Sequence, residues 1–442
     1  MKALLTKLGL GAVSALAVAA APVAAQNVVI NNATLVTGDG SEPVEGGQVI
    51  VLNGEVIHAG TPRTSLAPPD TAVIDAEGAY VTPGIFATVT TLGIWDVGAV
   101  SESNDTRAGG SPFSAALDTA PIVNPNSQHI LVHRAAGITR AATATLPSGS
   151  IFAGQGAIID LDSDGQPVMR ARAFQMVDLG EGGGQIAGGS RASTYALFRA
   201  ALREAQALVG ASGTPQTTEI VKGDEVMLSR FDAEALVPVV RGEQKLYVAV
   251  ERAADIRSVL RLKREFPRLD LVLVGASEGW TVATEIAASG VPVIADGLDD
   301  LPSGFDQLAS TQSNIGRMVK AGVRVAINAA SMEDPRRLSQ VAGNLVALTR
   351  VPGADGLSWG QAFAAITSVP AAISGLGGRA GVLANGALGD VVIWDGDPLE
   401  VGSVPTQVFI GGVEQPLGNH QSRLKERYRD LDESDLPKAY DW

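Results

Sequence analysis

The middle of the chain alternates between apolar runs of strand length and amphipathic stretches. The apolar runs cover residues 138–144, 246–250, 271–274, 291–295 and 323–327. A segment with helical spacing of apolar residues lies near each of the last four runs. Strand and helix alternating over roughly 300 residues indicate an α/β protein with a parallel sheet, and this length predicts a closed (β/α)8 TIM-like barrel. A doubly wound open sheet is the alternative, but no Gly-rich turn follows the first strand.

Both flanks of this alternating region are rich in β-formers. Residues 28–30 and 34–36 surround Asn31-Asn32, and residues 48–52 and 55–58 surround Asn53-Gly54. These patterns predict two β-hairpins, since Asn-Gly between β-rich runs favours a tight turn. Further strands are predicted at 390–394 and 407–410. We therefore expect a small β-sandwich domain built from both chain ends, 26–82 and 384–416, around a barrel at 83–383.

The first 25 residues have the pattern of a secretory signal peptide. Lys2 and Lys7 precede an apolar run at 8–21, and Val23-Ala24-Ala25 gives a small-residue cleavage pattern after Ala25. An uncleaved membrane anchor is the alternative, but the run is short and ends at Pro22. The sequence thus predicts a periplasmic or secreted protein with no membrane span after cleavage.

Composition narrows the possible partners and chemistry. The 442 residues are 45% hydrophobic and 18% charged, which describes an ordered globular protein. The chain has no cysteine, so disulfides, thiolate metal sites and cysteine nucleophiles are excluded. A formal charge of −14 argues against nucleic acid as a partner, because phosphate binding needs a basic surface. Residues 417–442 form a charged tail that we expect to be a solvated helix and chain end.

Two end motifs resemble those of one enzyme family. The run Thr82-Pro83-Gly84-Ile85-Phe86, preceded by the turn at 75–78, is similar to the strand that opens the barrel of metal-dependent amidohydrolases. Residues 386–394 resemble the strand that returns the chain to that family's small β-domain. The chain thus resembles the amidohydrolase superfamily, in its imidazolonepropionase-like branch. The resemblance implies hydrolysis of carbon–nitrogen bonds other than peptide bonds, by water activated on zinc or another divalent metal.

The metal ligands that the resemblance implies are replaced in this chain. Val89 and Thr91 stand where the family has His-x-His after its first strand, and Ala249 and Glu251 replace histidines of the fifth. The sixth strand, 271–276, has no histidine, and Ala330 stands where the eighth has aspartate. Valine and alanine have no lone pair for a metal, and a single threonine hydroxyl is a poor zinc ligand. We expect no metal centre and no other cofactor.

A histidine count supports the same expectation. Four histidines are present: His58, His129, His133 and His420. His58 belongs to a predicted hairpin and His420 to the tail. His129 and His133 lie four residues apart on a predicted helix before the second strand, a spacing that could suit one zinc ion. Since no acid accompanies this pair, solvated or capped helical histidines are the favoured interpretation.

Two further segments have recognisable local patterns. The glycine-rich run from 179 to 191 precedes a predicted helix at 192–208, and its amides could hold an anion together with Arg191. It lacks a P-loop lysine, so a rim loop is the favoured interpretation. A capping box at Ser358-Trp359-Gly360-Gln361 predicts a later helix start. No G-x-S-x-G nucleophile motif is present.

Acidic residues after the predicted strands remain as candidate catalytic groups. Asp96 and Asp105 follow the first strand, and Glu251 with Arg252 ends the fifth. At a barrel mouth they could act as general acid and base, hold a hard cation or recognise a zwitterionic ligand. Rim solvation, helix capping or an ion pair that plugs the pocket is the alternative. The sequence therefore predicts a hydrolase without the binuclear metal centre. The alternative is an inactive pseudoenzyme that binds a small ligand or a protein at the barrel mouth.

Overall fold

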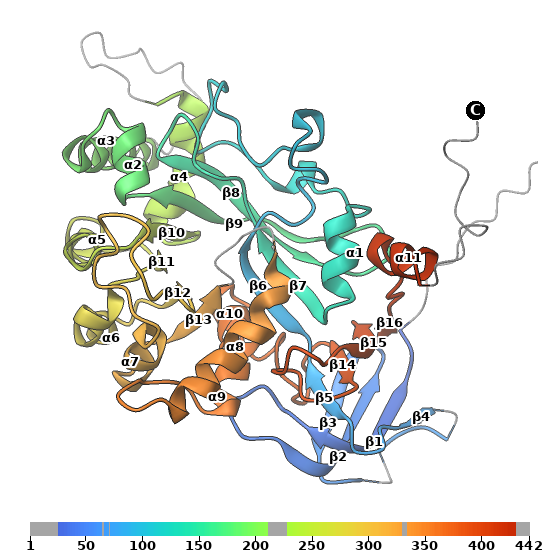
Figure 1. Cartoon of the computed structure of the whole chain (residues 1–442). Helices are drawn as coiled ribbons and strands as arrows, with labels where there is room; N and C mark the ends of the chain where they lie inside the picture. Colours follow the sequence, from blue (N-terminus) through green and yellow to red (C-terminus); the bar gives the residue numbers. More distant parts are fainter. Residues whose placement is uncertain (1–24, 64–65, 70, 211–227, 329–333, 430–442) are drawn as a thin grey trace, which may run out of the picture.

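The computed structural model describes residues 25–63, 66–69, 71–210, 228–328 and 334–429 (Figure 1). The predicted signal peptide, but for Ala25, and the end of the tail, residues 430–442, lie outside the described residues. Strands form two eight-stranded sheets, one in a barrel and one in a smaller β-domain. Within the described residues, no helix combines the length and the apolar composition that crossing a bilayer requires.

The barrel sheet has the strand order β13-β12-β11-β10-β9-β8-β7-β6. Its strands are β6 (Ile85–Thr90), β7 (Ile138–Thr143), β8 (Phe152–Asp160), β9 (Val168–Asp178), β10 (Lys245–Val250), β11 (Leu271–Gly275), β12 (Val293–Asp296) and β13 (Val325–Asn328). Five neighbours, β9 to β13, pair in parallel in chain order. The predicted TIM-like barrel is thus present, and its carboxyl-end rim is formed by consecutive strands.

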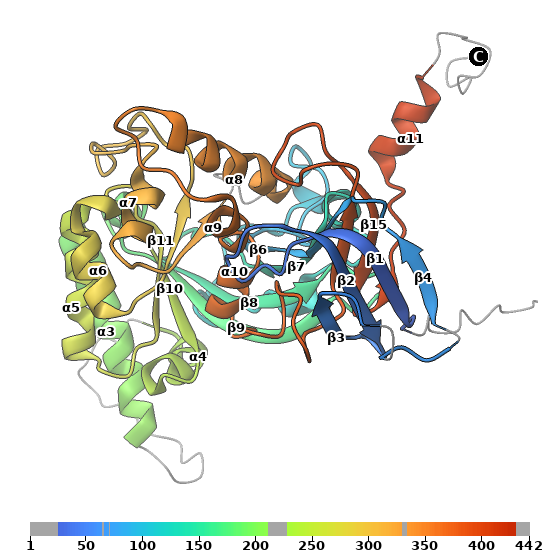
Figure 2. The same cartoon turned by 90° about the horizontal axis from the view of Figure 1, so that it is seen from below.

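Most of the helices lie on the outside of the barrel (Figure 1). The α-helices of the described residues are α1 (Gln128–Arg134), α2 (Glu181–Ile186), α3 (Arg191–Gly210), α4 (Arg230–Arg241), α5 (Ala253–Glu265), α6 (Ala283–Ser289), α7 (Asn314–Lys320), α8 (Leu338–Ala347), α9 (Trp359–Ala364), α10 (Ser368–Ile373) and α11 (His420–Arg427). Of these, α10 packs against the side chains of the lumen, and α11 projects away from the barrel in Figure 2. Short 3-10 helices connect some of the α-helices: η1 (Ser101–Ser103), η2 (Ala120–Ile122), η3 (Gly279–Val282), η4 (Pro335–Arg337) and η5 (Leu348–Arg350). From β9 onward each parallel strand is followed by at least one α-helix, as the sequence pattern predicts.

The first half of the barrel departs from the regular (β/α)8 pattern. β8 pairs antiparallel with both β7 and β9. The connections at 144–151 and 161–167 contain no helix. They are shorter than the crossover of about a dozen residues that parallel neighbours need, so the chain turns back as a meander. An all-parallel barrel was therefore the wrong prediction for this half.

The ring of strands is closed by a segment outside the named strands. Ile327 of β13 donates a backbone hydrogen bond to the carbonyl of Ala365 (2.9 Å), and Phe86 of β6 donates one to the carbonyl of Ile366 (3.0 Å). Residues 365–366 thus bridge the two edge strands. Because both edges find hydrogen-bond partners there, the barrel has little open sheet edge.

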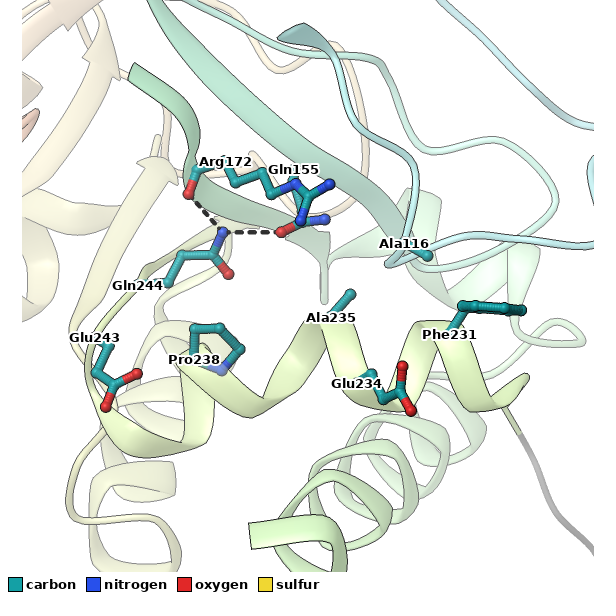
Figure 3. Close-up of a pocket in the computed structure, with 9 residues that line it drawn as sticks. All are labelled: Ala116, Gln155, Arg172, Phe231, Glu234, Ala235, Pro238, Glu243 and Gln244. Carbon is teal, nitrogen blue, oxygen red and sulfur yellow. Dashed lines mark hydrogen bonds between the residues drawn. The ribbon is translucent and has the colours of Figure 1, made fainter. Parts of the chain in front are cut away.

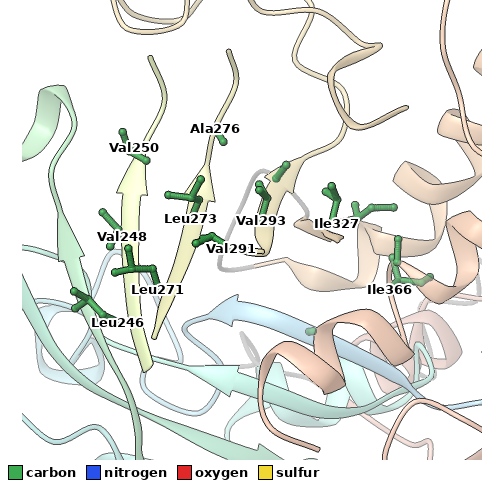
Figure 4. Close-up of a cluster of buried hydrophobic side chains, with 14 of the residues drawn as sticks. Leu246, Val248, Val250, Leu271, Leu273, Ala276, Val291, Val293, Ile327 and Ile366 are labelled. Carbon is green, nitrogen blue, oxygen red and sulfur yellow. The ribbon is translucent and has the colours of Figure 1, made fainter. Parts of the chain in front are cut away.

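Alternating side chains of the barrel strands form two separate apolar layers. In β10, Leu246, Val248 and Val250 face the surrounding helices, whereas Tyr247 faces the lumen. Figure 4 shows the outward layer continuing across β11, β12 and β13. The lumen is packed by large side chains such as Phe86 and Phe174, with residues of α10 below them. The lumen is therefore a filled core, and a site would lie at the rim formed by the carboxyl ends of the strands.

The second sheet combines strands from both chain ends in the order β16-β15-β14-β5-β1-β2-β3, with β4 paired to β1. It lies beside the barrel in Figure 2. The strands are β1 (Val28–Leu35), β2 (Val44–Leu52), β3 (Glu55–Gly60), β4 (Ala72–Asp75), β5 (Tyr80–Pro83), β14 (Val391–Trp394), β15 (Pro405–Ile410) and β16 (Val413–Glu414). A sandwich arrangement and the predicted domain boundaries stay predictions, since the structure shows one mixed sheet here.

One of the two predicted hairpins is present. Asn53 and Gly54 turn with φ of 51° and 81° between β2 and β3, as predicted. The hairpin at Asn31-Asn32 was wrong, because β1 runs through both residues. Asn32 has a φ of 53° and the pairing of β1 with β2 shifts register there, so these residues form a bulge in one strand.

Candidate functional site

The carboxyl ends of the parallel strands gather polar residues at one rim of the barrel. Asp178, Asp296 and Asn328 are the last residues of β9, β12 and β13, and Glu251 directly follows β10. Asp296 and Asn328 are register partners. Since parallel neighbours end at the same edge, these side chains share the barrel mouth, where TIM-like barrels place their sites.

Glu251 is held by the loop that follows β11. Its Oε2 accepts hydrogen bonds from the Ser277 amide (2.9 Å) and the Ser277 hydroxyl (2.7 Å). Gly275 leaves room for this carboxylate, since a Cβ there would lie 2.1 Å from the Glu251 Oε1. Gly275 also has a φ of +91°, which side-chain-bearing residues rarely adopt. The sequence at the end of β11 therefore fixes the position of Glu251.

The surroundings of Glu251 change its protonation. Burial has the largest effect and raises the pKa of its carboxyl. The two hydrogen bonds from Ser277 lower the pKa, and the net result is a rise from 4.5 to about 7. The negative charges of Asp296 and Asp306 contribute to this rise. A carboxyl with a pKa near neutrality exchanges a proton readily at physiological pH, which is the property of a general acid or base.

Asp178 is wrapped by the glycine-rich segment. The Gly180 amide donates to Asp178 Oδ1 at 2.8 Å, and a Cβ at Gly182 or Gly183 would collide with Asp178 atoms. Burial, with the charge of Asp306 adding to it, raises the Asp178 pKa. Residues 181–186 form helix α2, so the predicted rim loop is partly helical. These glycines hold a carboxylate of the same chain, which gives them a structural role.

Two arginines near this rim form ion pairs with Asp255 and Asp306. Arg252 donates to both carboxylate oxygens of Asp255, at 3.1 and 2.9 Å. These hydrogen bonds raise the pKa of the Arg252 guanidinium. Arg191, at the start of α3, pairs with Asp255 (2.9 Å) and with Asp306 (3.6 Å). Arg252 thus pairs within the first turn of α5 and leaves the carboxylate of Glu251 to Ser277.

Asp96 and Asp105 lie on the loop after β6. The Asp96 carboxylate accepts from the Gln128 amide (3.1 Å) and from Asn124 Nδ2 (3.4 Å), at the start of α1. Asp105 is exposed, and its amide donates to the carbonyl of Ile94 (2.9 Å). Among the described residues, no hydrogen bond or ion pair joins either acid to Glu251 or Arg252. Glu251 and Arg252 are chain neighbours whose side chains have different partners, Ser277 and Asp255. Asp96 lies in a helix-capping position.

The described residues do not offer a fitting metal site. Across these residues, no group of three or more histidine, aspartate or glutamate side chains has an arrangement able to hold an ion. His133 lies on α1, where Nδ1 bonds the His129 carbonyl (2.6 Å) and Nε2 faces Asp334 (3.5 Å). His129 stacks on Trp95. The helical histidines are therefore engaged on α1, away from the strand-end positions that the resemblance implies.

The positions of the implied strand-one ligands are filled by packing. Val89 is 1% exposed and belongs to the apolar cluster of the lumen. Its φ of 53° is rare for a β-branched residue. Thr91 is fully buried and accepts a hydrogen bond from Trp95 Nε1 (3.0 Å). Ala330, the implied eighth-strand position, lies outside the described residues.

Several residues of this site escape sequence reasoning. Ser277 and Asp306 act through long-range contacts, and neither belongs to a sequence motif of proton transfer. Asp178 could have been found from its place after Phe174-Gln175-Met176-Val177, a short and mainly apolar segment that is typical of a buried strand. An acid directly after such a run is the signal that Asp178 shares with Asp296.

Comparison with known proteins places this geometry in context. Residues 169–412 match the model of a family described as the Amidohydrolase family. Amidohydrolase tasK of Hapsidospora irregularis is 24% identical over 435 residues, covering 88% of this chain and 43% of that protein. The chain thus spans less than half the length of this curated relative.

An amidohydrolase from Thermotoga maritima MSB8 has a similar structure, with a TM-score of 0.75, 23% identity, and coverage of 88% of this chain and 99% of that one. Molinate hydrolase matches with a TM-score of 0.52, 16% identity, and coverage of 89% and 95%. These structural likenesses establish the fold.

Proposed function

Because the chain belongs to the amidohydrolase family, we propose that it hydrolyses carbon–nitrogen bonds other than peptide bonds, with Glu251 as the proton-transfer group. The raised pKa of Glu251, at the end of β10 in the barrel mouth, is the observation that carries the proposal. The end motifs at 82–86 and 386–394 favour the imidazolonepropionase-like branch. Membership in the family supplies the hydrolase class, and the residues of the mouth supply the mechanism.

In the proposed reaction Glu251 first accepts a proton and later donates it. The ionised carboxylate takes a proton from a water molecule, whose oxygen then forms a bond to the carbonyl carbon of the substrate. When the carbon–nitrogen bond breaks, the protonated Glu251 returns that proton to the leaving nitrogen. Proton transfer by a positioned side chain contributes about 10²- to 10⁴-fold in rate. Ser277 keeps the carboxylate in place during both steps through its two hydrogen bonds.

We further propose that the chain lacks the binuclear metal centre of its family. Val89, Thr91 and Ala249 stand at implied ligand positions and carry no strong metal ligand. The packing of Val89 in the lumen supports this proposal, because histidine there would need the space that the apolar cluster fills. Export to the periplasm or outside the cell is proposed from the pattern of residues 1–25.

A second candidate is a pseudoenzyme that binds a small ligand at the same mouth. The observation that favours it is the internal pairing of Arg252 with Asp255 and of Arg191 with Asp255 and Asp306. In these pairs the arginines are already bound to acids of the same chain, so they are not free to bind a charged substrate. The two candidates share a site and differ in whether Glu251 turns over a substrate.

The test is a hydrolysis screen with a pH profile. The mature chain, with residues 1–25 removed, is assayed on dihydropyrimidines, lactams and dipeptides, beside Glu251→Gln and the control Glu265→Gln. Glu265 is a surface glutamate paired with Arg199. We expect the wild-type rate to rise with pH through about 7 and Glu251→Gln to lose at least about 10²-fold. The control should match wild type.

The outcomes separate the candidates. Activity that persists in Glu251→Gln contradicts the role of Glu251. No turnover in the screen, combined with ligand-dependent thermal stabilisation that Glu251→Gln abolishes, favours the pseudoenzyme.

A further inference from the structure

A cavity lies outside the barrel, between helix α4 and strands β8 and β9. Its volume is about 370 Å³. Figure 3 shows α4 along one side and the side chains of Gln155, Arg172 and Gln244 on the other. Gln155 belongs to β8 and Arg172 to β9, and Gln244 directly precedes β10. The cavity opens on the helix side of the sheet, so it is separate from the mouth that holds Glu251.

Buried amides form the polar wall of this cavity. Gln155 and Gln244 are each 5% exposed. The Gln244 Nε2 donates to the backbone carbonyl of Arg172 (2.8 Å) and to Gln155 Oε1 (3.3 Å). These two bonds fix the orientation of the amide, and its Oε1 then finds no hydrogen-bond partner among the described residues. In Figure 3 this oxygen is directed toward Pro238 and Ala235 of α4, across the cavity.

This acceptor is one of several buried side-chain atoms that have no hydrogen-bond partner among the described residues. Buried polar atoms in native proteins nearly always bond to protein, to water or to a ligand. The oxygen needs an N–H or O–H donor, and no described residue supplies one. The wall therefore selects ligands that donate hydrogen bonds.

The other walls add negative charge and apolar surface. Glu243 lines the cavity, and its carboxylate has no ion pair within the described part of the chain. The guanidinium of Arg172, by contrast, is already paired with Asp118 at 2.7 Å. Phe231 is 63% exposed at one end, and Pro238 lies inside α4 facing the cavity. Proline has no amide hydrogen, so the carbonyl of Glu234 one turn earlier is a further acceptor without its usual helical donor.

We propose that this cavity binds a small organic cation with N–H donors, of the amidinium or guanidinium class. One N–H donates to Gln244 Oε1, and the positive charge lies near Glu243. The apolar part of the ligand packs on Pro238 and Phe231, where a cation can also meet the ring face. The acidic balance of the whole chain, −14, favours the approach of a cation to such a site.

Three isosteric probes test the proposal by isothermal titration calorimetry on the mature chain. Benzamidine is the cation, benzamide is its neutral analogue and benzoate is its anionic analogue. We expect benzamidine to bind at least tenfold more tightly than benzamide, and benzoate not to bind. Equal affinity for the three probes would overturn the assignment of the ligand class.

Variants then locate the binding. Gln244→Leu removes the orphan acceptor, and Glu243→Gln removes the charge, so each should weaken benzamidine at least tenfold. Glu45→Gln, which removes the same charge from an exposed position of β2, should not change binding. Phe231→Ala alters an exposed side chain and tests the cavity even where Gln244→Leu fails to fold. Unchanged affinity in Glu243→Gln and Phe231→Ala would overturn the proposal.

One further variant separates this cavity from the barrel mouth. Benzamidine binding should persist in Glu251→Gln, because Glu251 belongs to the other site. Loss of binding in that variant, with full binding in Glu243→Gln, would place the cation at the mouth and overturn the proposal.

Discussion

Ser277 donates two hydrogen bonds to one oxygen of Glu251, from its hydroxyl at 2.7 Å and from its amide at 2.9 Å. Both bonds favour the ionised carboxylate and lower its pKa. Burial and the nearby charges of Asp296 and Asp306 oppose them, and burial has the largest effect. The result is a carboxyl whose pKa lies near 7, held in one position by a serine that Gly275 and Ala276 precede.

The raised pKa of Glu251 predicts a pH-dependent cost in stability. Below pH 4.5 the carboxyl is protonated in both the folded and the unfolded chain, so it has no effect. As pH rises from 4.5 to about 7, the unfolded chain ionises first, and the folded state loses stability. Above pH 7 this cost is constant at about 3 kcal/mol. Glu251→Gln removes it.

The measurement is urea unfolding of both proteins at pH 4 and pH 8. The free energy of unfolding of Glu251→Gln, relative to wild type, should be higher at pH 8 than at pH 4 by about 3 kcal/mol. The Ser277 hydrogen bonds, which favour the ionised carboxylate, are already included in the pKa of about 7, so the difference between the two pH values needs no separate correction for them. A difference that is the same at both pH values would contradict the raised pKa.

Gly275 is expected to be essential to this arrangement. In Gly275→Ala the new Cβ would lie 2.1 Å from Glu251 Oε1, so the carboxylate must move. Gly290 is a matched control, since it also has a positive φ (+68°) but no atom within 4 Å of its Cβ position. We expect Gly290→Ala to cost about 1 kcal/mol through backbone strain alone. Gly275→Ala should lower the free energy of unfolding by more than this and should also lower turnover at least tenfold. Equal effects of the two variants on turnover would contradict the role of Gly275.

Sequence reasoning worked best where local chemistry decides the structure. Asn53-Gly54 forms the predicted turn, and Ser358 with Gln361 forms the predicted capping box. Both features depend on side chains within four residues of one another. The strands from β10 to β13 were also found, because each is a short apolar run followed by an amphipathic helix.

The meander of β7, β8 and β9 could not be found in this way. In β8, Gly154 and Gly156 interrupt the apolar pattern, and in β9 the first residues, from Val168 to Arg172, are exposed. The Asn31-Asn32 pair was read as a turn, but register with β2 and β4 keeps it inside one strand. Such pairings depend on residues far away in sequence. The same limit applies to Ser277, whose role appears only when β10 and β11 are side by side.

The proposed loss of the metal centre predicts a low metal content. After expression in medium supplemented with zinc, manganese and iron, the mature protein should carry less than one equivalent of these metals. The reason is the absence of strong ligands at Val89, Thr91 and Ala249. Elemental analysis by mass spectrometry measures this directly. Two equivalents of tightly held zinc, or activity that a chelator abolishes, would contradict the proposal.

Installing the missing histidines should not restore a metal site. The double variant Val89→His and Thr91→His puts two polar rings where Val89 is 1% exposed and Thr91 is fully buried. Burying polar groups without partners costs about 1–3 kcal/mol each, so thermal stability should fall. Zinc titration should still show less than one equivalent, because the remaining ligands and their supporting hydrogen bonds are missing. Zinc binding accompanied by new hydrolysis would contradict this expectation.

The ion pair between Arg140 and Asp390 is expected to hold the barrel to the β-domain. Arg140 on β7 donates to both oxygens of Asp390, at 2.6 and 2.9 Å, and the two residues are 4% and 1% exposed. Arg140 also lies 3.5 Å from the carboxylate of Asp160, so it keeps one acid after the substitution. Breaking a buried pair is still strongly destabilising, and Asp390→Asn should lower the free energy of unfolding by about 3 kcal/mol, the low end of the usual range. Glu265→Gln is the control, because it breaks a similar two-pronged pair with Arg199 whose side chains are 38% and 35% exposed. That exposed pair should contribute at most about 1 kcal/mol. Urea unfolding measures both variants, and equal losses would mean that burial does not set the strength of the Arg140 pair.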